Sequence, residues 1–338
     1  MTHEFKEIVL RALQAQKSKL KSVLVTVVGL DGSSYRRPGV RMLILENGEM
    51  IGAVSGGCVE KEILLQSESV FKTEEPKIMT YDGKYRLGCE GVLYILLELF
   101  HPDATFEKSF KDCLKSRHAF QIQSYFSKEL GSVPEMGSIV KIDNNDFSIQ
   151  GKQLSKPEHL NVFTQTMPPC FKLVILGAEH DAVQLCKYAA LTGWEVTIVT
   201  GHNEAKTIEN FHGANQFFSI SPEEVSEIPV DEQTAVVIMS HNFAKDLRYL
   251  VALEESRPIY IGILGPTKRR EDLLSQFIEY CPEIDSELLD IIHGPAGIDI
   301  GSETPQEIAV SIISEILAVA RKRDTISLSK KKGKIHKS

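Results

Sequence analysis

One cysteine of the sequence stands in a setting that suits chemistry. The segment "GAVSGGCVE" (52–60) places Gly56 and Gly57 directly before Cys58, and a helix-periodic segment follows. We therefore expect Cys58 at the start of a helix, where unpaired N–H groups favour anions and lower the pKa of a thiol. The two glycines would let a ligand approach the main chain closely. The alternative is that the thiol is a buried packing residue, as free cysteines usually are, and this alternative is favoured for Cys89 in "LGCEG".

A predicted hairpin brings an arginine-rich loop to this cysteine. In "VRMLILENGEMIGAV" (40–54) the pair Asn47-Gly48 predicts a two-residue type I′ turn, which makes Arg41 face Val54. The loop "GSSYRRPGVR" and the segment "SGGC" then meet at the same open end, where arginines and main-chain N–H groups suit an anionic ligand that also contacts sulfur. The alternatives are a solvated arginine face and a glycine pair that serves only a turn. The candidate binding residues are Ser33, Ser34, Arg36, Arg37, Gly39, Arg41, Ser55, Gly56, Gly57 and Cys58.

A second candidate site follows an apolar strand in the second half of the chain. The segment "GAEHDA" (177–182) lies where a dinucleotide-binding fingerprint would lie, between a strand and a helix. Glu179 occupies the second glycine position, where a carboxylate would crowd and repel a pyrophosphate. Thr200 stands where an acidic ligand of the ribose is expected. Both residues argue against NAD(P) as a cofactor, although an NAD(P)-dependent oxidoreductase remains the alternative function.

Polar residues gather at the predicted carboxyl edge of this second sheet. His180 and Asp181 follow the first strand, and His241 follows the fourth, which is its neighbour in the order 3-2-1-4-5. The segment "GPTKRRED" adds Lys268, Arg269 and Arg270 near another helix start. A metal site formed by the first three residues is one interpretation, and satisfied structural histidines are the favoured one. We expect an anion-binding crevice here, with the candidates Gly177, His180, Asp181, His241, Lys268 and Arg269.

The N-terminal elements that would position Cys58 form a small α/β domain over residues 1–100. Apolar residues at helical spacing predict a helix over 5–16, and β-branched or apolar runs predict strands over 22–29, 77–81 and 91–99, besides the hairpin. Residues 101–168 are predicted to be a connecting segment with α+β elements: a helix near 105–117 and strands near 119–126 and 137–142.

The second half of the chain alternates buried strands with helices. The runs "KLVILG", "EVTIVT", "TAVVIMS" and "IYIGILG" predict a Rossmann-like doubly wound parallel sheet over residues 169–325. Thr304, Pro305 and Glu307 form a capping box that begins its last helix. Residues 326–338 are predicted to be a basic, disordered tail. The fold class is therefore α/β, with a small N-terminal α/β domain and a C-terminal Rossmann-like domain.

Composition excludes several classes of protein. A net charge of −8 argues against nucleic-acid binding. No apolar run reaches the roughly 18 residues of a membrane span, and the charged first residues do not resemble a signal peptide. Six cysteines without CxxC or zinc-ligand spacing suit free thiols in a reducing cytoplasm. We therefore expect a cytoplasmic protein that binds neither membranes nor nucleic acids.

Six motifs together resemble one known family. They are "GSSYRRPGVRMLI", "GAVSGGCVE", "LGAEHDAVQL", "SHNFAKDLRYL", "YIGILGPTKRRED" and "HGPAGIDIGSETPQEIAVSIISEI". In this order they are similar to the xanthine dehydrogenase accessory factors (the XdhC/CoxI family) over roughly 20–100 and 165–320. The chain departs from the family at Glu179, where a glycine is usual, and at Thr200, where an Asp is frequent.

The resemblance implies a cofactor chaperone without turnover of its own, and hence no catalytic residue. Such a protein binds the molybdenum cofactor (molybdopterin) and delivers it to a molybdenum hydroxylase such as xanthine dehydrogenase. The resemblance also implies sulfuration of the cofactor, with a cysteine desulfurase as a further partner, and a homodimer. The family pattern carries over to Ser55, Gly56, Gly57 and Cys58 and to the loop 32–41. A thiolate suits molybdenum, so Cys58 is the candidate metal contact.

Overall fold

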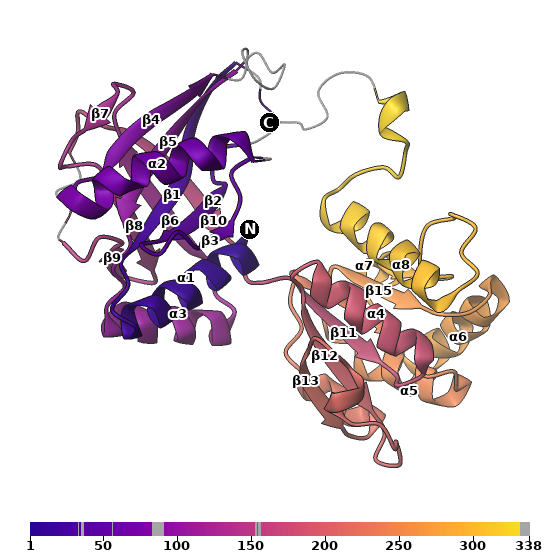
Figure 1. Cartoon of the computed structure of the whole chain (residues 1–338). Helices are drawn as coiled ribbons and strands as arrows, with labels where there is room; N and C mark the ends of the chain where they lie inside the picture. Colours follow the sequence, from indigo (N-terminus) through magenta and orange to yellow (C-terminus); the bar gives the residue numbers. More distant parts are fainter. Residues whose placement is uncertain are drawn as a thin grey trace. The chain divides into compact units, whose positions relative to one another are not determined.

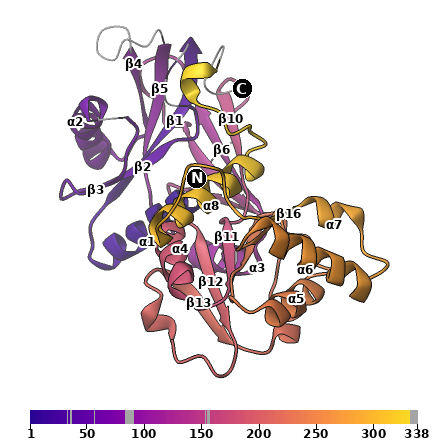
Figure 2. The same ribbon diagram turned by 90° about the vertical axis from the view of Figure 1, so that its right-hand side faces the viewer.

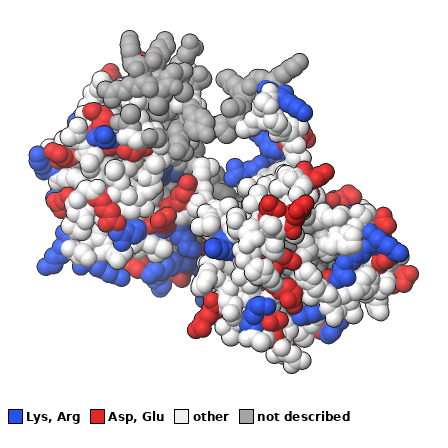
Figure 3. All heavy atoms as spheres, turned by 45° about the vertical axis from the view of Figure 1, so that its right-hand side comes forward, with Lys and Arg blue, Asp and Glu red and all other residues white. Residues whose placement is uncertain are grey.

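The chain folds into two compact units, Met1–Pro169 and Cys170–Ser338 (Figure 1). The computed structural model describes residues 1–32, 34, 37–55, 57–82, 91–152, 154 and 157–331, without the side chain of Cys58. Among these residues, no helix is long and apolar enough to cross a membrane. On the face shown in Figure 3, acidic and basic side chains are interspersed over the C-terminal unit.

The N-terminal unit is built on a six-stranded antiparallel sheet, sheet A, in the order β3-β2-β1-β5-β4-β7. Its strands are β1 (Ser22–Gly32), β2 (Arg41–Leu45), β3 (Met50–Gly52), β4 (Lys77–Asp82), β5 (Gly91–Leu99) and β7 (Gly131–Ser132). Helix α2 (Cys58–Thr73) covers one face, because Val59, Ile63 and Val70 pack against the apolar side chains of the strands, as their spacing predicts. Figure 2 shows α2 on one side of sheet A and β6 and β10 on the other.

The other face of sheet A packs on α1 (Thr2–Lys17), α3 (Ala104–Ser116) and a second antiparallel sheet, sheet B. Sheet B has the order β10-β6-β8-β9. Its strands are β6 (Phe120–Phe126), β8 (Gly137–Ile142), β9 (Asn145–Ser148) and β10 (Asn161–Met167). The ring of Phe5 lies 5.8 Å from Phe110 and 6.0 Å from Phe120. Residues 101–168 therefore share a core with residues 1–100, and the prediction of a separate connecting segment is corrected.

The hairpin of β2 and β3 differs by one residue from its predicted register. Ile44 pairs with Met50 and Met42 with Gly52, and Leu45 N–H donates to the carbonyl oxygen of Glu49 at 2.9 Å. The connection is a three-residue loop in which only Gly48, at φ +87°, has a left-handed backbone. This arrangement matches a type I turn followed by a bulge glycine, rather than a type I′ turn, which requires a positive φ at Asn47 as well. The predicted pairing of Arg41 with Val54 is therefore wrong.

A buried carboxylic acid lies between the two sheets. Glu98 is fully buried and accepts hydrogen bonds from the Ser138 N–H (2.8 Å), the Ser138 hydroxyl (2.5 Å) and the Gln150 amide (3.3 Å). The Ser138 hydroxyl also contacts that of Ser124 at 2.8 Å. Burial raises the pKa of Glu98 and outweighs the opposing hydrogen bonds from Ser138 and Gln150.

Replacing Glu98 by glutamine (Glu98→Gln) is expected to stabilise the N-terminal unit relative to the parent progressively as pH rises. Above about pH 4.3 the unfolded parent ionises first, so the parent loses stability until the raised folded pKa is reached. The stability difference should widen by up to about 1.4 kcal/mol per pH unit in that window. Urea unfolding followed by circular dichroism and by amide exchange in β5 measures it. A difference that stays constant between mildly acidic and mildly alkaline pH would contradict the buried-acid interpretation.

The C-terminal unit contains a six-stranded parallel sheet, sheet C, in the order β13-β12-β11-β14-β15-β16. This order confirms the predicted doubly wound topology. The strands are β11 (Lys172–Leu176), β12 (Glu195–Thr200), β13 (Ala214–Ser219), β14 (Thr234–Ile238), β15 (Tyr260–Ile263) and β16 (Ile292–His293). The edge strand β13 had no sequence signal, because its side chains "ANQFFS" are largely exposed and do not alternate.

Helices cover both faces of sheet C (Figure 2). One face carries α4 (His180–Leu191) and α8 (Pro305–Ala320), and the other carries α5 (Phe243–Ala252), α6 (Thr267–Tyr280) and α7 (Ser286–Asp290). The predicted capping box of α8 is confirmed, because Glu307 N–H donates to Thr304 Oγ1 and Thr304 N–H donates to Glu307 Oε2. Of the predicted tail, Leu328–Lys330 forms a short turn, η4, and residues 332–338 lie outside the described residues.

Candidate functional site

Several segments of the N-terminal unit leave sheet A at the same end. The register pairs Thr26 with Arg41 and Met42 with Gly52, so the residues that lead into β2 and the segment that leaves β3 lie side by side, while β1 continues beyond them to Gly32. The register also pairs Gly32 with Gly91, which places the flanks of residues 83–90 at this end. The end of the arginine loop therefore enters β2 beside the segment that leads to Cys58. The contact of Arg36 with Cys58 stays a prediction, because both side chains lie outside the described residues.

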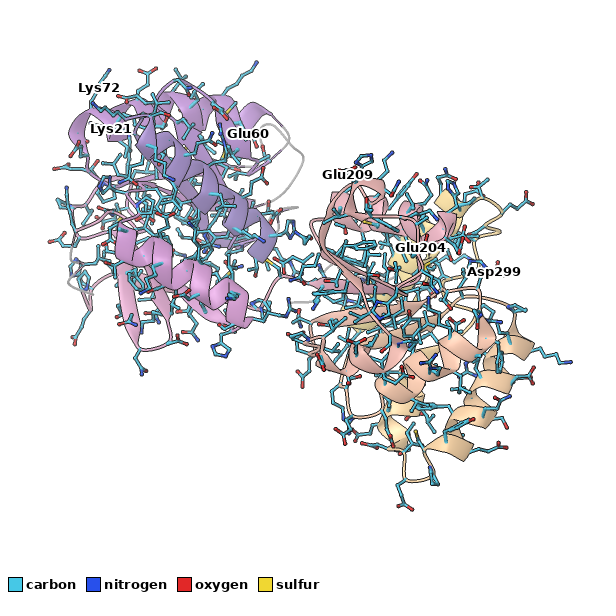
Figure 4. All side chains as sticks on the ribbon, turned by 90° about the horizontal axis from the view of Figure 1, so that it is seen from below. Lys21, Glu60, Lys72, Glu204, Glu209 and Asp299 are labelled. Atoms are coloured by element: carbon cyan, nitrogen blue, oxygen red, sulfur yellow. The ribbon has the colours of Figure 1, made fainter. Side chains whose placement is uncertain are left out.

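A glutamate organises the start of α2. Glu60 is 7% exposed and accepts hydrogen bonds from the Ser55 and Gly57 N–H groups and from the Ser55 hydroxyl, the last at 2.9 Å. Figure 4 labels Glu60. Burial alone would raise the pKa of Glu60, but the hydrogen bonds from Ser55 and Gly57 outweigh it and hold the pKa below its ordinary value. An ionised carboxylate therefore already lies where the sequence predicts a bound anion.

This role of Glu60 was missed by sequence reasoning, although a signal existed. Glu60 stands three residues after Gly57, the N-cap of α2, and a glutamate at that spacing accepts the N-cap N–H, which is the half of a capping box that does not need an N-cap side chain. Gly57 has φ +120°, and a Cβ placed on it would meet none of the described residues within 4 Å. The main chain of Ser55 and Gly57 is thus held from one side by Glu60.

Arg41 is not part of this open end. Its side chain is 7% exposed and lies on the face of sheet A opposite to α2, with its guanidinium 5.6 Å from the centre of the Phe5 ring. It donates to the Gly39 carbonyl oxygen at 3.1 Å and to the Gln165 side chain, and burial lowers its pKa to about 10. The predicted placement of Arg41 in the anion site is corrected: strand alternation points this side chain into the core.

Gly39 also has a structural role. It is buried with φ +97°, and a Cβ there would lie 2.5 Å from the amide nitrogen of Gln165. Ser34 is half-buried and Arg37 is exposed. The remaining predicted members Ser33, Arg36 and Gly56, together with Cys89 and the side chain of Cys58, lie outside the described residues.

The other described cysteines are unsuited to a ligand. Cys113, Cys170, Cys186 and Cys281 are free and buried. Burial raises the pKa of Cys186 to about 12 and that of Cys281 to about 11, so both thiols stay protonated.

The structure brings together part of the predicted cluster in the C-terminal unit. His241 Nε2 lies 3.4 Å from Asp181 Oδ2. His241 follows β14, and Asp181 lies in the first turn of α4, which follows the neighbouring strand β11. His241 is half exposed and has a left-handed backbone, at φ +56°. The described residues include no group of three His, Cys, Asp or Glu side chains that could hold a metal, so the interpretation of His180, Asp181 and His241 as a metal site is not supported.

Arg269 and Arg270 are engaged in structural contacts. Arg269 Nη2 donates to Asp246 Oδ2 at 2.7 Å, and Asp246, only 1% exposed, also accepts hydrogen bonds from the N–H and the hydroxyl of Ser240. Arg270 donates to the Ile292 carbonyl oxygen at 3.2 Å, whereas Lys268 is exposed. The prediction that Arg269 binds an anion is therefore corrected: through Asp246 this residue holds the loop that carries His241. The other members of the predicted crevice stay predictions.

The remnants of the dinucleotide-binding fingerprint have structural explanations. A Cβ on Gly177 would lie 2.4 Å from the Met239 carbonyl oxygen, so this glycine allows the chain after β11 to pass the end of β14. Glu179 is the exposed N-cap of α4, and Thr200 is 1% exposed. A carboxylate at this helix start disfavours a pyrophosphate, as the sequence predicts.

Comparisons with known proteins agree with this architecture. A family model described as XdhC Rossmann domain matches residues 173–316, and one described as XdhC and CoxI family matches residues 15–82. A probable xanthine dehydrogenase subunit of Bacillus subtilis (strain 168) is 29% identical over 321 residues, 90% of this chain and 94% of that protein. The molybdenum cofactor insertion chaperone PaoD of Escherichia coli (strain K12) is 24% identical over 324 residues, 94% of this chain and 90% of that protein.

A solved structure has the same fold. The crystal structure of a xanthine dehydrogenase from Bacillus halodurans matches with a TM-score of 0.76 at 24% identity, over 94% of this chain and 96% of that chain. The two family models match the two halves of the chain in the order in which its motifs predict them. The chain therefore belongs to the XdhC and CoxI family.

Proposed function

We propose that this protein binds the molybdenum cofactor and delivers it to a molybdenum hydroxylase such as xanthine dehydrogenase. The names of its relatives, one a part of a xanthine dehydrogenase and the other a molybdenum cofactor insertion chaperone, support an accessory role of this kind. The observation that carries the proposal is the end of sheet A, where the arginine loop enters β2 at Arg41 beside Gly52, from which the glycine segment before Cys58 leaves the sheet.

The cargo has two chemical features that this end of the sheet suits. Its phosphate would bind the arginines of the loop, Arg36 and Arg37, because guanidinium groups match phosphate oxygens. Its molybdenum would contact the thiolate of Cys58, a soft ligand. The start of α2 does not take the phosphate in this proposal, since Glu60 already accepts the N–H groups of Ser55 and Gly57.

The test is whether the purified protein carries the cofactor and passes it on. Protein purified without oxygen from a host that makes the cofactor should release a pterin that fluoresces after oxidation, and protein from a host without the pathway should not. Mixing the loaded protein with the cofactor-free hydroxylase should restore hydroxylase activity. Absence of pterin from both preparations would refute the proposal. Sulfuration, a cysteine desulfurase partner and a homodimer stay predictions.

A further inference from the structure

The C-terminal unit has a pocket that the proposed function does not use. It lies between the loop 201–204 after β12, residues 220–222 after β13 and the first two turns of α5, and its volume is about 590 Å³. This volume falls within the range of about 300–1,000 Å³ typical of small-molecule sites. The pocket lies at the carboxyl edge of a doubly wound sheet, where ligands of this fold class bind. Asn242, on its wall, directly follows His241.

Lys245 provides the charge of this pocket. A Cβ on Gly201 would lie 3.1 Å from Lys245 Nζ, so the ammonium lies directly over bare main chain. Its nitrogen is also 5.8 Å from the centre of the Tyr249 ring, a cation–π distance that favours one orientation. Within residues 157–331, no carboxylate lies within 4 Å of this ammonium.

Arg248 and Glu204, the other side chains of the pocket wall that carry a charge at neutral pH, each have a partner of opposite charge. Arg248 makes two hydrogen bonds to Glu223, at 2.5 and 2.6 Å. Glu204, labelled in Figure 4, lies 3.9 Å from Lys206, and His202 lies 3.9 Å from Glu224. Lys245 is therefore a cation on the pocket wall that has no carboxylate partner among residues 157–331, which favours an anionic ligand beside it.

The other residues that line the pocket indicate which kind of molecule carries the anionic group. Asn203 offers an amide group, Asn242 offers the NH2 of an amide whose oxygen caps α5, and Ser221 offers a hydroxyl oxygen whose proton is donated to Glu224. These groups suit the hydroxyls of a sugar or the edge of a base. Ile220 and Pro222 add an apolar surface for a flat ring. Glu179 at the start of α4 disfavours a second phosphate. These features fit one nucleotide and not a dinucleotide.

We propose that this pocket binds a nucleoside monophosphate, with the phosphate on Lys245 and the nucleoside between the loops after β12 and β13. The site is independent of cofactor carriage by the N-terminal unit, so either can fail without the other.

The experiment is calorimetric titration of the full chain with the four ribonucleoside 5′-monophosphates, with adenosine, with inorganic phosphate and with NADH. At least one monophosphate should bind at micromolar concentration, and adenosine and inorganic phosphate should each bind at least about tenfold more weakly, because each lacks half of the contacts. Failure of every monophosphate at millimolar concentration would overturn the proposal. So would NADH binding more tightly than all of them.

The variant Lys245→Met should weaken monophosphate binding by about 10- to 100-fold, the usual range for a hydrogen bond to a charged group. Lys187→Met removes an exposed lysine of α4 on the opposite face of sheet C and is the matched control, with affinity expected to equal that of the parent. Fluorescence of Trp194, the only tryptophan, reports whether each variant keeps its fold. Equal affinity of the folded Lys245→Met variant and the parent would overturn the assignment of the phosphate to Lys245.

Discussion

Replacing Asp246 by alanine (Asp246→Ala) is expected to destabilise the C-terminal unit by about 3–5 kcal/mol, the usual cost of removing one partner of a buried ion pair. Asp246 is 1% exposed and Arg269 is 23% exposed, so the change leaves a largely buried guanidinium without its carboxylate, 2.7 Å away in the parent. It also removes the acceptor of the Ser240 N–H and hydroxyl. Urea unfolding followed by the fluorescence of Trp194, which lies in this unit, measures the effect.

The matched control is an exposed ion pair that involves the same helix. Glu223 and Arg248 also form short hydrogen bonds, but their side chains are 58% and 55% exposed. Glu223→Gln should therefore change stability by at most about 1 kcal/mol, because water screens the pair. If Asp246→Ala cost no more than Glu223→Gln, the buried pair would not be what holds the loop of His241.

The backbone pattern of this protein could largely be predicted from the sequence. Buried parallel strands such as "KLVILG" are continuous apolar runs, and the capping box at Thr304 marks the start of α8, so local chemistry alone locates both. The register of the hairpin of β2 and β3 was harder to predict. Asn47-Gly48 suits both a two-residue and a three-residue loop, and the difference of one residue depends on packing of the whole strand rather than on the turn.

The side-chain partners could not be predicted in the same way. Arg41 was expected at the open end because the predicted hairpin register pairs it with Val54, yet its side chain contacts Phe5 and Gln165, the latter more than a hundred residues away. Arg269 was expected to bind an anion, and its partner Asp246 belongs to another helix. Both corrections have one cause: a long-range partner decides whether a cationic side chain is free for a ligand, and spacing along the chain does not reveal it.

The boundary of the first unit illustrates the same limit. Residues 101–168 contain recognisable elements, and the helix and strands predicted there exist as α3, β6 and β8. Their apolar residues, however, are shared with α1 and sheet A in one core. A segment that looks like a connection in the sequence is therefore the second layer of the unit, and it supplies Gln165, which Arg41 contacts.

Because of Glu60, anion binding and activation of the Cys58 thiol become two separate roles at the start of α2. A helix start was expected to bind the anion and to activate the thiol of Cys58. Glu60 accepts the N–H groups of Ser55 and Gly57, so the main chain of these two residues is already bound to a carboxylate before any ligand arrives. Pre-organisation of this kind lowers the entropic cost of binding. It leaves the proposed contact with the cargo to the first residue of the helix, Cys58.

Replacing Cys58 by alanine (Cys58→Ala) is accordingly expected to lower retention of the molybdenum cofactor by at least about tenfold, since even indirect changes at a metal ligand commonly cost 10- to 100-fold. Retention is measured as the oxidised pterin released by protein purified without oxygen. Cys113→Ala is the matched control, because this buried cysteine belongs to the same unit but to the core on the other face of sheet A. It should lower stability, through the cavity it leaves, and not retention. Equal pterin from the Cys58→Ala variant and the parent, with both folded, would remove the thiol from the site and leave the arginine loop to hold the cargo through its phosphate alone.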